Sequence, residues 1–512
     1  MFKGYTLGSL ATVLGIVPVG PVETPVLRLT TDSRAVQPGD VFVALKGERF
    51  DAHQFLPAVA KQGAIAAVVE QVDPSVDLPQ LQVANTRQAL AKLAQNNRQQ
   101  FHGLTAAVTG SSGKTTVKEL LASILRAALG ADAVLATRGN LNNELGVPFT
   151  LLELNQTHRA AVIELGASHL GEINYTVQLA APSVAIITNA GNAHIGEFGG
   201  LDNIVQAKGE IIDGCDSVQQ VVLNLDDAAY AKWQQRAGQR QVSSFSLQDT
   251  AADWYAADIV LDPVQGSRFQ LCYQGQSLGE IQLQLLGQHN IANALAAAAA
   301  AKALGIEQAS IVAGLQSIRA VAGRMQRHQL AGITLIDDSY NANPVSMCAA
   351  IDLLSQAAGE RILVLGDMGE LGEWSQEGHA AVGRHASGRV DALYAVGQEI
   401  QAAVNAYQGP NAYFFASQAE LLAHLLPQLS GEKTILVKGS RSAAMDHVVQ
   451  GKLFRAILFR ICGGAVPYFA RHFWGVNGTG AVALARALDD SYLAWIADWS
   501  IGSHRWPTKP FI

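Results

Sequence analysis

Residues 104–125 read LTAAVTGSSGKTTVKELLASIL. An apolar run, LTAAVT, leads into a glycine-rich turn, and an amphipathic run, VKELLASIL, follows it. This order predicts a β-strand, a tight turn over residues 110–113, and a helix that begins near Lys114. In such a turn the backbone amides point inward around a phosphate, and the helix N-terminus adds positive potential. The stretch therefore predicts a phosphate-binding loop in an α/β fold.

The residue types within this loop suit nucleotide phosphates. Lys114 can reach the outer phosphates, and the hydroxyl of Thr115 can ligate Mg²⁺. The spacing is a shortened GxxGKTT, because the general GxxxxGK pattern would require glycine where Val108 stands. A glycine turn with an incidental lysine is the alternative, and the flanking strand and helix argue against it. The candidate phosphate-binding residues are Gly110, Ser111, Ser112, Gly113, Lys114, Thr115 and Thr116.

Strand-like runs and helical stretches alternate on both sides of the loop. AAVIEL, SVAIIT and QVVLNL read as strands of a parallel sheet in a βαβ pattern, and an alanine helix, IANALAAAAAAKALG, closes this block. Before it, VFVALKG and IAAVVE read as strands, FLPAVAKQGA as a helix, and TRQALAKLAQNNRQQ as a linking helix. After it come three more strand-then-loop units, ITLIDDSYNANP, RILVLGDMGELG and TILVKGSRS. These patterns predict an α/β chain with blocks 1–100, 101–320 and 321–452 and a tail, 453–512.

Composition sets the class of protein. At ~150 residues per domain, 512 residues suggest about three domains, and 49% hydrophobic residues exclude a disordered chain. A net charge of −7 argues against a general nucleic-acid binder, which would show a basic face. Four widely spaced cysteines without a CxxC pair fit a reducing compartment.

Targeting and membrane signals are weak along the chain. Within the first twenty residues, Leu7, Leu10, Ala11 and Leu14 share one face of an expected amphipathic helix, which we favour over a signal peptide. No uncharged run reaches the ~18 apolar residues that a spanning helix needs. We therefore expect a cytoplasmic protein without stable membrane insertion. The tail lacks the strand–loop–helix pattern, and the alternatives for it are a poorly ordered appendage, a chain end altered by a shifted reading frame, or an interfacial membrane helix.

Acidic, imidazole and amine groups follow the predicted central strands. Glu164 closes AAVIE, His194 follows SVAIIT, and Lys208 lies fourteen residues further on. Ligands of open α/β sheets bind outside the carboxyl ends of the strands, where Glu164 and His194 fall. Mg²⁺ prefers hard oxygen ligands, so Glu164 is a natural ligand while a single histidine is unusual. Each residue alone would more often be structural, but their combination with the phosphate loop predicts a catalytic site.

Two further polar runs are candidate nucleotide contacts. Asn290 and Asn293, in GQHNIANALAA, stand at the start of a helix, where they could bind an adenine edge or cap the helix. DDSYNANP, residues 337–344, is a polar loop after a strand, and loops on a rigid sheet commonly carry function.

Together these motifs resemble the Mur ligases. The resemblance rests on TGSSGKTT, RGNLNNELGVPFTLL, ELGASHLGEI, TNAGNAHIGEFG with AKGEI, GQHNIANALAA, DDSYNANP, GDMGELG and LVKGSRS. The N-terminal TDSRAVQPGDVFVALKGERFDAHQF is also similar to the family's UDP-sugar domain. The motifs occur in the family's order over residues 1–450, and the tail matches no family element.

The resemblance implies a fold, a reaction and partners. The fold would be a UDP-binding N-terminal α/β domain, a central ATPase domain with a parallel sheet, and a C-terminal Rossmann-like domain. The closest branch of the family uses ATP and Mg²⁺ to add D-alanyl-D-alanine to UDP-N-acetylmuramoyl-tripeptide through an acyl phosphate, in peptidoglycan biosynthesis. A monomer is expected, and the third residue of the tripeptide, diaminopimelate or lysine, stays open.

Residue roles follow from the same resemblance. Lys114, His194 and Lys208 would be catalytic. Thr115 and Glu164 would hold one Mg²⁺, and His194 and a carbamylated Lys208 the second; carbamylation turns a cation into an anionic oxygen ligand and needs a lowered lysine pKa. The nucleotide would contact Asn290, Asn293, Arg324, Asp338 and Asn341, and the other substrates Ser33, Arg34, Lys46 and Lys438.

Other functions stay open at this stage. A sister Mur ligase or a folylpolyglutamate-synthase-like ligase would share the ATPase core, although the DNPR-type loop typical of the diaminopimelate-adding sister is absent from the sequence. A non-catalytic nucleotide-binding paralogue is the alternative outside enzymes. Such a paralogue would have little reason to keep Lys114, Thr115, Glu164, His194 and Lys208 together.

Overall fold

The computed structural model describes residues 1–47, 50–191, 195–262, 266–330 and 332–449. His194 and the tail after residue 449 lie outside the described residues. The chain divides into two compact units. Among the described residues, the first contains 1–321, 343–353 and 368–382, and the second contains 322–342, 354–367 and 383–449.

The first unit begins with a short helix and a small parallel sheet. Helix α1 (Leu7–Leu14) buries Leu7, Leu10, Ala11 and Leu14, as the spacing of its apolar residues predicts. The sheet has the order β1-β2-β3-β4, and all its strands run parallel. Its strands are β1 (Arg28–Thr30), β2 (Asp40–Val43), β3 (Ala66–Val69) and β4 (Gln80–Gln82), and the short helix α2 (Leu56–Lys61) lies between β2 and β3 in the chain.

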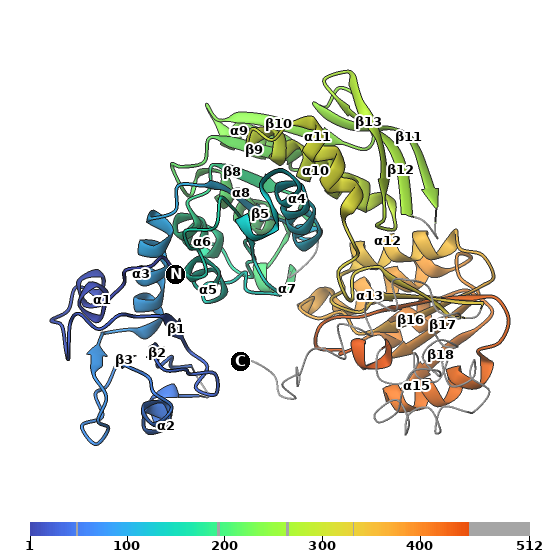
Figure 1. The fold of residues 1–512 in the computed structure, drawn as a ribbon. Coiled ribbons are helices and arrows are strands. Elements are labelled where there is room, and N and C mark those ends of the chain that lie inside the picture. The colour runs from blue at the N-terminus through green and yellow to red at the C-terminus, as the bar shows by residue number, and fades with distance from the viewer. Residues whose placement is uncertain (48–49, 192–194, 263–265, 331, 450–512) are drawn as a thin grey trace, which may run out of the picture. The chain divides into compact units, whose positions relative to one another are not determined.

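A nine-stranded sheet forms the centre of the first unit (Figure 1). Its order is β13-β12-β11-β10-β9-β8-β5-β7-β6. After β5 the chain crosses to the β6 edge and returns through β7, and β8 then pairs on the other side of β5. The chain thus changes direction across the sheet at β5, and ligands of open α/β sheets bind at such a point. These strands are β5 (Leu104–Thr109), β6 (Val134–Ala136), β7 (Ala160–Glu164), β8 (Val184–Ile187), β9 (Gln220–Asn224) and β10 (Gln241–Ser246).

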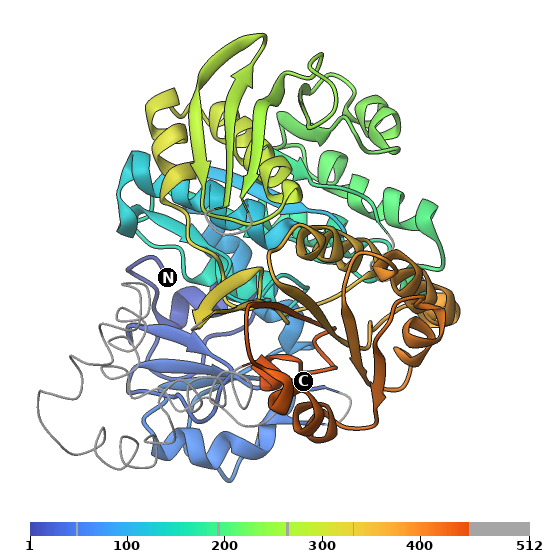
Figure 2. The ribbon, with the colours of Figure 1, turned by 90° about the vertical axis from the view of Figure 1, so that its right-hand side faces the viewer.

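The sheet is parallel from β6 to β11 and antiparallel beyond. Strands β11 (Trp254–Asp262), β12 (Gly266–Tyr273) and β13 (Gln276–Leu283) pair antiparallel and lie together in both ribbon views (Figures 1 and 2). Gln274 and Gly275, both with positive φ, join β12 to β13, as in the two-residue turns that suit hairpins. The βαβ pattern of the sequence predicts only a parallel sheet here, so the antiparallel extension differs from that prediction.

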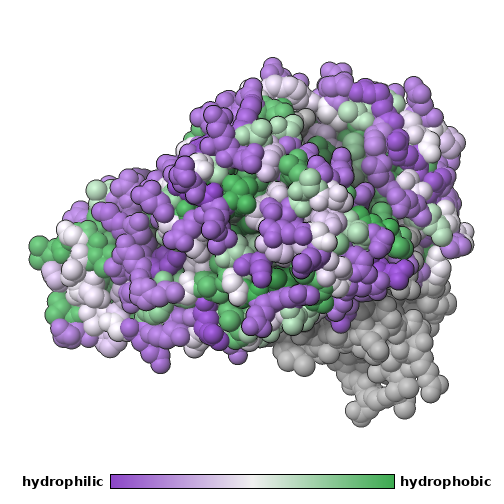
Figure 3. Space-filling model, turned by 90° about the horizontal axis from the view of Figure 1, so that it is seen from above, coloured by the Kyte–Doolittle hydropathy of each residue, from purple (hydrophilic) through white to green (hydrophobic). Residues whose placement is uncertain are grey.

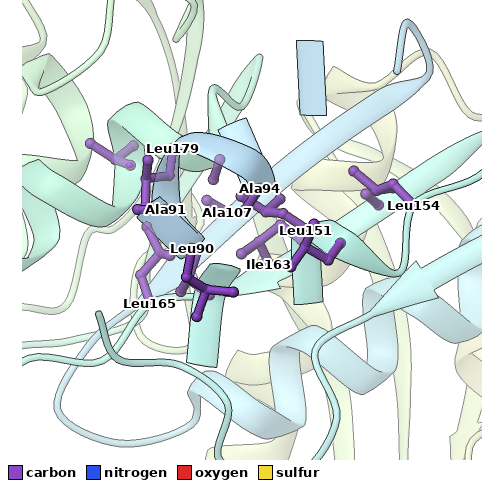
Figure 4. Close-up of a cluster of buried hydrophobic side chains, with 14 of the residues drawn as sticks. Leu90, Ala91, Ala94, Ala107, Leu151, Leu154, Ile163, Leu165 and Leu179 are labelled. Atoms are coloured by element: carbon purple, nitrogen blue, oxygen red, sulfur yellow. The ribbon is translucent and has the colours of Figure 1, made fainter. Parts of the chain in front are cut away.

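Helices cover both faces of the central sheet. On one face, α3 (Thr86–Gln99) packs with α5 (Gly146–Leu152) and α6 (Glu172–Ala180). Figure 4 shows Leu90, Ala91 and Ala94 of α3 beside Ala107 of β5 and Ile163 of β7. On the other face lie α4 (Lys114–Leu129), α11 (Gln308–Ser317) and α10 (Gln288–Ala303). Residues 293–301 of α10 are all buried, because alanine side chains let a helix approach its neighbours from every side.

The second unit is built on a six-stranded sheet of order β14-β15-β19-β16-β17-β18. β14 (Gln326–Leu330) runs antiparallel to β15, and the other neighbours are parallel. Asp338, at the end of β15, stands directly opposite Lys438, at the end of β19. The remaining strands are β15 (Ile333–Asp338), β16 (Glu360–Gly366), β17 (Ala392–Val396), β18 (Ala412–Phe415) and β19 (Lys433–Lys438), and helices α14 (Gln401–Ala406) and α15 (Gln418–Leu425) precede and follow β18.

The surface is mainly polar where Figure 3 shows it. Hydrophilic side chains predominate on that face, and the hydrophobic ones form small separate groups. Among the described residues, none of the helices combines the length and the apolar character needed to cross a bilayer.

Candidate functional site

The predicted phosphate loop lies between β5 and α4, and two of its glycines are required by their surroundings. Gly110 has φ +146°, and a Cβ there would stand 1.9 Å from Oγ1 of Thr188. Gly113 has φ +81°, and a Cβ there would stand 2.4 Å from Oδ1 of Asn293. Any larger residue at either position would force the loop away from its neighbours. The loop is therefore fitted between the segment that follows β8 and helix α10.

The segment after β8 holds the loop in place through hydrogen bonds. The Ser112 amide donates to Oδ1 of Asn189 at 3.0 Å, and the Thr188 hydroxyl donates to the Ser112 carbonyl at 2.5 Å. The Ser111 hydroxyl donates to the carbonyl of Gly191 at 2.9 Å. Thr188 and Asn189 are not among the predicted site residues, although both follow β8 at the strand end where ligand-binding residues are expected. They keep the loop backbone in one conformation.

Lys114 and Thr115 begin helix α4. Nζ of Lys114 donates to the carbonyl of Gly110 at 2.6 Å, so the ammonium lies over the curled backbone of the loop. The buried Thr115 hydroxyl donates to Oε2 of Glu164 at 2.9 Å. The predicted pair of Mg²⁺ ligands is thus in direct contact, although the two residues are 49 positions apart.

Glu164 is buried at the end of β7 and is held from several sides. Its Oε1 accepts a hydrogen bond from Nδ2 of Asn142 at 2.8 Å, and its amide donates to the Thr137 hydroxyl at 2.9 Å. A hydroxyl and a carboxylate in contact are the hard oxygen donors that Mg²⁺ prefers, so these residues fit the ion that the family implies. Within the described ranges, no group of three or more His, Cys, Asp or Glu gathers as a metal site. His194, the predicted ligand of a second ion, lies outside those ranges.

Lys208 is enclosed in the first unit. It lies on α8 (Leu201–Asp213) with 1% of its surface exposed, and its Nζ is 5.1 Å from the centre of the Phe198 ring. Burial, together with the nearby charge of Lys114, lowers the pKa of Lys208 to about 7, although Glu172 and Glu210 act in the opposite direction. Much of this amine is therefore neutral near neutral pH.

Asn290 and Asn293 are buried in the first turns of α10. Nδ2 of Asn293 donates to Oδ1 of Asn290 at 2.9 Å, and Nδ2 of Asn290 donates to the carbonyl of Leu286 at 2.7 Å. The helix begins after Gly287 without a side-chain cap, so the capping interpretation of these asparagines is wrong. The Oδ1 atom of Asn293 instead lies against Gly113 of the phosphate loop.

The candidate UDP residues follow neighbouring strands of the first sheet. Ser33 and Arg34 come after β1, and Lys46 comes after β2. These two strands are parallel neighbours, so the three residues follow the same edge of the sheet. The exposed guanidinium of Arg34 forms an ion pair with Asp32 at 2.8 Å. Their role in binding stays a prediction.

Four of the predicted residues lie close together in the second unit. Nζ of Lys438 is 2.5 Å from Oδ2 of Asp338 and donates to the carbonyl of Asn341 at 3.0 Å. The guanidinium of Arg324 lies 4.2 Å from the centre of the Tyr340 ring. Lys438 was predicted as a substrate residue and Asp338 as a nucleotide residue, and in this structure they form one buried ion pair.

Family models match most of the chain. The Mur ligase family catalytic-domain model matches residues 26–98, the Mur ligase middle-domain model 108–301, and the Mur ligase glutamate-ligase-domain model 323–441. The chain belongs to the Mur ligase family. The middle-domain match contains the phosphate loop, Glu164, Lys208 and both asparagines of α10.

Among the curated relatives of this Mur ligase are two named UDP-N-acetylmuramoyl-tripeptide–D-alanyl-D-alanine ligase. The Haemophilus influenzae protein is 42% identical, covering 86% of this chain and 96% of its own. The Escherichia coli protein is 44% identical, covering 82% and 92%. Among solved structures, MurF from Acinetobacter baumannii is 40% identical with a TM-score of 0.81 and covers 88% of this chain and 98% of its own. MurF from Thermotoga maritima in complex with ADP is 27% identical with a TM-score of 0.76, covering 85% and 98%.

Proposed function

We propose that this Mur ligase joins D-alanyl-D-alanine to UDP-N-acetylmuramoyl-tripeptide with the consumption of ATP, as the names of its relatives describe for them. One observation carries the proposal. A phosphate loop and a contacting Thr115–Glu164 pair lie where the chain changes direction across the central sheet, in a chain that is 42–44% identical to those ligases over the aligned residues. The sister-ligase and non-catalytic alternatives lack comparable support.

The reaction needs activation of a carboxylate. The tripeptide carboxylate attacks the γ-phosphorus of ATP and ADP leaves, which gives an acyl phosphate. The amine of D-alanyl-D-alanine then attacks the acyl carbon, phosphate leaves, and the amine loses a proton. We assign Lys114 to the negative charge that gathers on the transferred phosphoryl group, because its ammonium is held within the loop.

Thr115 and Glu164 would hold Mg²⁺, and the bound ion would neutralise phosphate charge in both the ground state and the transition state. The amides at the start of α4 would orient the phosphates, and Asn189 and Thr188 hold the preceding loop backbone at Ser112 in place. Asn290, Asn293, Arg324, Asp338 and Asn341 are our candidates for the rest of the nucleotide. The ADP complex of the Thermotoga maritima relative supports a nucleotide as one substrate.

We also propose that Lys208 is carbamylated in the working enzyme. A neutral amine attacks CO₂ and loses a proton, and the burial of Lys208 supplies the neutral amine. Lys208→Ala should lose activity and regain part of it with added short carboxylic acids, which restore an anionic oxygen. The exposed Lys232 provides a matched control, because Lys232→Ala should keep full activity with or without the acids. Full activity of Lys208→Ala without acids would contradict the carbamate.

The remaining expectations are a monomer that works in the cytoplasm, where ATP and UDP-linked precursors are available.

Phosphate release with ATP, Mg²⁺ and UDP-N-acetylmuramoyl-tripeptide tests the whole proposal. The rate should depend on D-alanyl-D-alanine, and single amino acids should not replace it. Turnover with another acceptor would keep the ATP chemistry and overturn the substrate. No turnover with any acceptor would favour a nucleotide-binding paralogue.

A further inference from the structure

A second lysine of α4, Lys118, is buried beside the candidate metal ligands. It lies one helical turn after Lys114, and 1% of its surface is exposed. Lysine is almost never buried to this degree without partners, because removing an ammonium from water is costly. Neither the phosphate loop nor the assignments above give Lys118 a role.

The ammonium of Lys118 faces three oxygen atoms. It donates to the carbonyl of Thr137 at 2.6 Å and lies 2.9 Å from Oε1 of Glu119. Oε2 of Glu164 is 4.0 Å away, and this is the oxygen that accepts the Thr115 hydroxyl. An ammonium has three donors, so the surroundings of Lys118 match its capacity.

Thr137 provides a second connection between Lys118 and Glu164. This residue follows β6 and is 1% exposed. Its carbonyl accepts from Lys118, while its hydroxyl accepts from the amide of Glu164 at 2.9 Å. Its own amide donates to the carbonyl of Val162 on β7 at 3.1 Å. Lys118 therefore fixes the backbone that carries Glu164 and also places a positive charge behind the carboxylate.

We propose that Lys118 is a positioning residue that orients Glu164 for Mg²⁺. The inference rests on the proposed function, in which Glu164 is a ligand of that ion. Thr115 and Asn142 hold the two carboxylate oxygens by hydrogen bonds, and Lys118 adds a fixed charge next to one of them. In a buried site such a charge is little screened, so it limits rotation of the carboxylate toward other partners. Partners of metal ligands typically contribute about 10- to 100-fold in metal affinity or activity.

The test substitutes Lys118→Met, which keeps most of the length and the apolar stem. We expect the Mg²⁺ concentration for half-maximal phosphate release to rise by about 10-fold or more, with kcat reduced and the KM for the UDP-linked substrate nearly unchanged. The matched control is Glu119→Gln, which alters the neighbouring partner of Lys118 but keeps an acceptor oxygen and the cation. That control should keep the Mg²⁺ requirement of the wild type.

A second readout does not depend on turnover. ADP should raise the unfolding temperature of the wild type more with Mg²⁺ than with a chelator. Lys118→Met should keep the rise caused by ADP alone and lose most of the part that Mg²⁺ adds. If Lys118→Met does not fold, Lys118→Gln serves instead, because its amide keeps a donor for the Thr137 carbonyl but removes the charge beside Glu164, so it should shift the Mg²⁺ requirement in the same direction.

The outcomes distinguish a failure of the role proposed for Lys118 from a failure of the proposed function. If Glu164→Gln raises the Mg²⁺ requirement while Lys118→Met, or Lys118→Gln in its place, leaves it unchanged, the role of Lys118 is overturned and Glu164 keeps its assignment. If Glu164→Gln itself leaves the Mg²⁺ requirement unchanged, the metal assignment under the proposed function fails first. If Lys118→Met lowers the unfolding temperature by the same amount with Mg²⁺ and with a chelator, the rise that Mg²⁺ adds is unchanged and Lys118 is purely structural.

Discussion

At the scale of single residues, the position of Lys114 depends on the loop around it. The Gly110 carbonyl holds its ammonium, and the helix that starts at Lys114 fixes its backbone. We expect Lys114→Ala to lower kcat by at least ~10²-fold, since a lost charge-assisted contact in a water-excluded site is worth ~3 kcal/mol or more. Phosphate release measures this, with the exposed Lys232→Ala as a control that keeps the wild-type rate. Near-normal turnover of Lys114→Ala would contradict the phosphate-loop assignment.

Lys208 gives a prediction for the pH dependence of stability. Its pKa is about 7 when folded, against an ordinary value of 10.5. Between these values the unfolded chain holds a proton that the folded chain has released, so stability rises with pH across this window. Lys208→Met removes the effect. In CO₂-free buffer, the variant should exceed the wild type in unfolding free energy near pH 7, and the difference should shrink above about pH 9. Urea unfolding of the wild type and the variant at each pH measures this difference in free energy. A difference that does not change with pH would contradict the lowered pKa of Lys208.

Residues that act through others were the hardest to predict from the sequence. Lys114, Thr115 and Glu164 were predicted together, and the structure brings Thr115 and Glu164 into contact, because a glycine turn and strand ends have local signatures. Lys118 was missed, since one lysine within a helix usually faces solvent. Asn189 was missed as well, because its hydrogen bond to Ser112 spans 77 residues of sequence.

At the scale of elements, helix α3 joins the first sheet to the central sheet in the chain and belongs to the core of the latter. Leu90 is fully buried among residues of the face shown in Figure 4. Leu90→Ala should cost ~2–5 kcal/mol of the unfolding free energy, because it leaves a cavity as well as losing buried apolar surface. The exposed Lys92 on the same helix supplies the control, and Lys92→Ala should stay within about 0.5 kcal/mol of the wild type. Chemical denaturation measures both, and equal losses would exclude a core position for Leu90.

Strong local patterns predicted most of the elements. The expected strands at AAVIEL, SVAIIT and QVVLNL are β7, β8 and β9, and the alanine run is α10. Strand β11 was missed, because Ala256 and Ala257 weaken the alternation of apolar residues and Asp258 has φ +52° at a break in register. Strands β17 and β18 were missed as well. Pairing with neighbours in the sheet supports such segments, and a single sequence does not show that pairing.

At the scale of the whole molecule, the two compact units have separate hydrophobic cores. We therefore expect two unfolding transitions in calorimetry. Lys438→Met should lower the free energy of unfolding of the second unit by ~3–5 kcal/mol, because it leaves the buried carboxylate of Asp338 without its cation. The unfolding temperature of the first unit should stay at its wild-type value. Leu90→Ala should instead lower the unfolding temperature of the first unit and leave that of the second unit unchanged.

A double variant separates the charge from the packing. Asp338→Asn combined with Lys438→Met removes both charges, so it should recover part of the stability lost in Lys438→Met. If the loss of unfolding free energy in the double variant equals the sum of the losses in the two single variants, the ion pair contributes nothing beyond its separate residues. The sequence could not predict this pair, since its members stand 100 residues apart and meet only because β15 and β19 are neighbours.

The hairpin of β12 and β13 offers a place to attach something to this enzyme. Five strands, β8 to β12, lie between β5 and β13, which at strand spacing is roughly 30 Å from the phosphate loop's own strand. Gln274 and Gly275 form only a tight connection there, and such tips commonly accept added chain. A fluorophore-binding tag or a surface anchor inserted between these two residues would report on single molecules during turnover while leaving the reacting groups untouched.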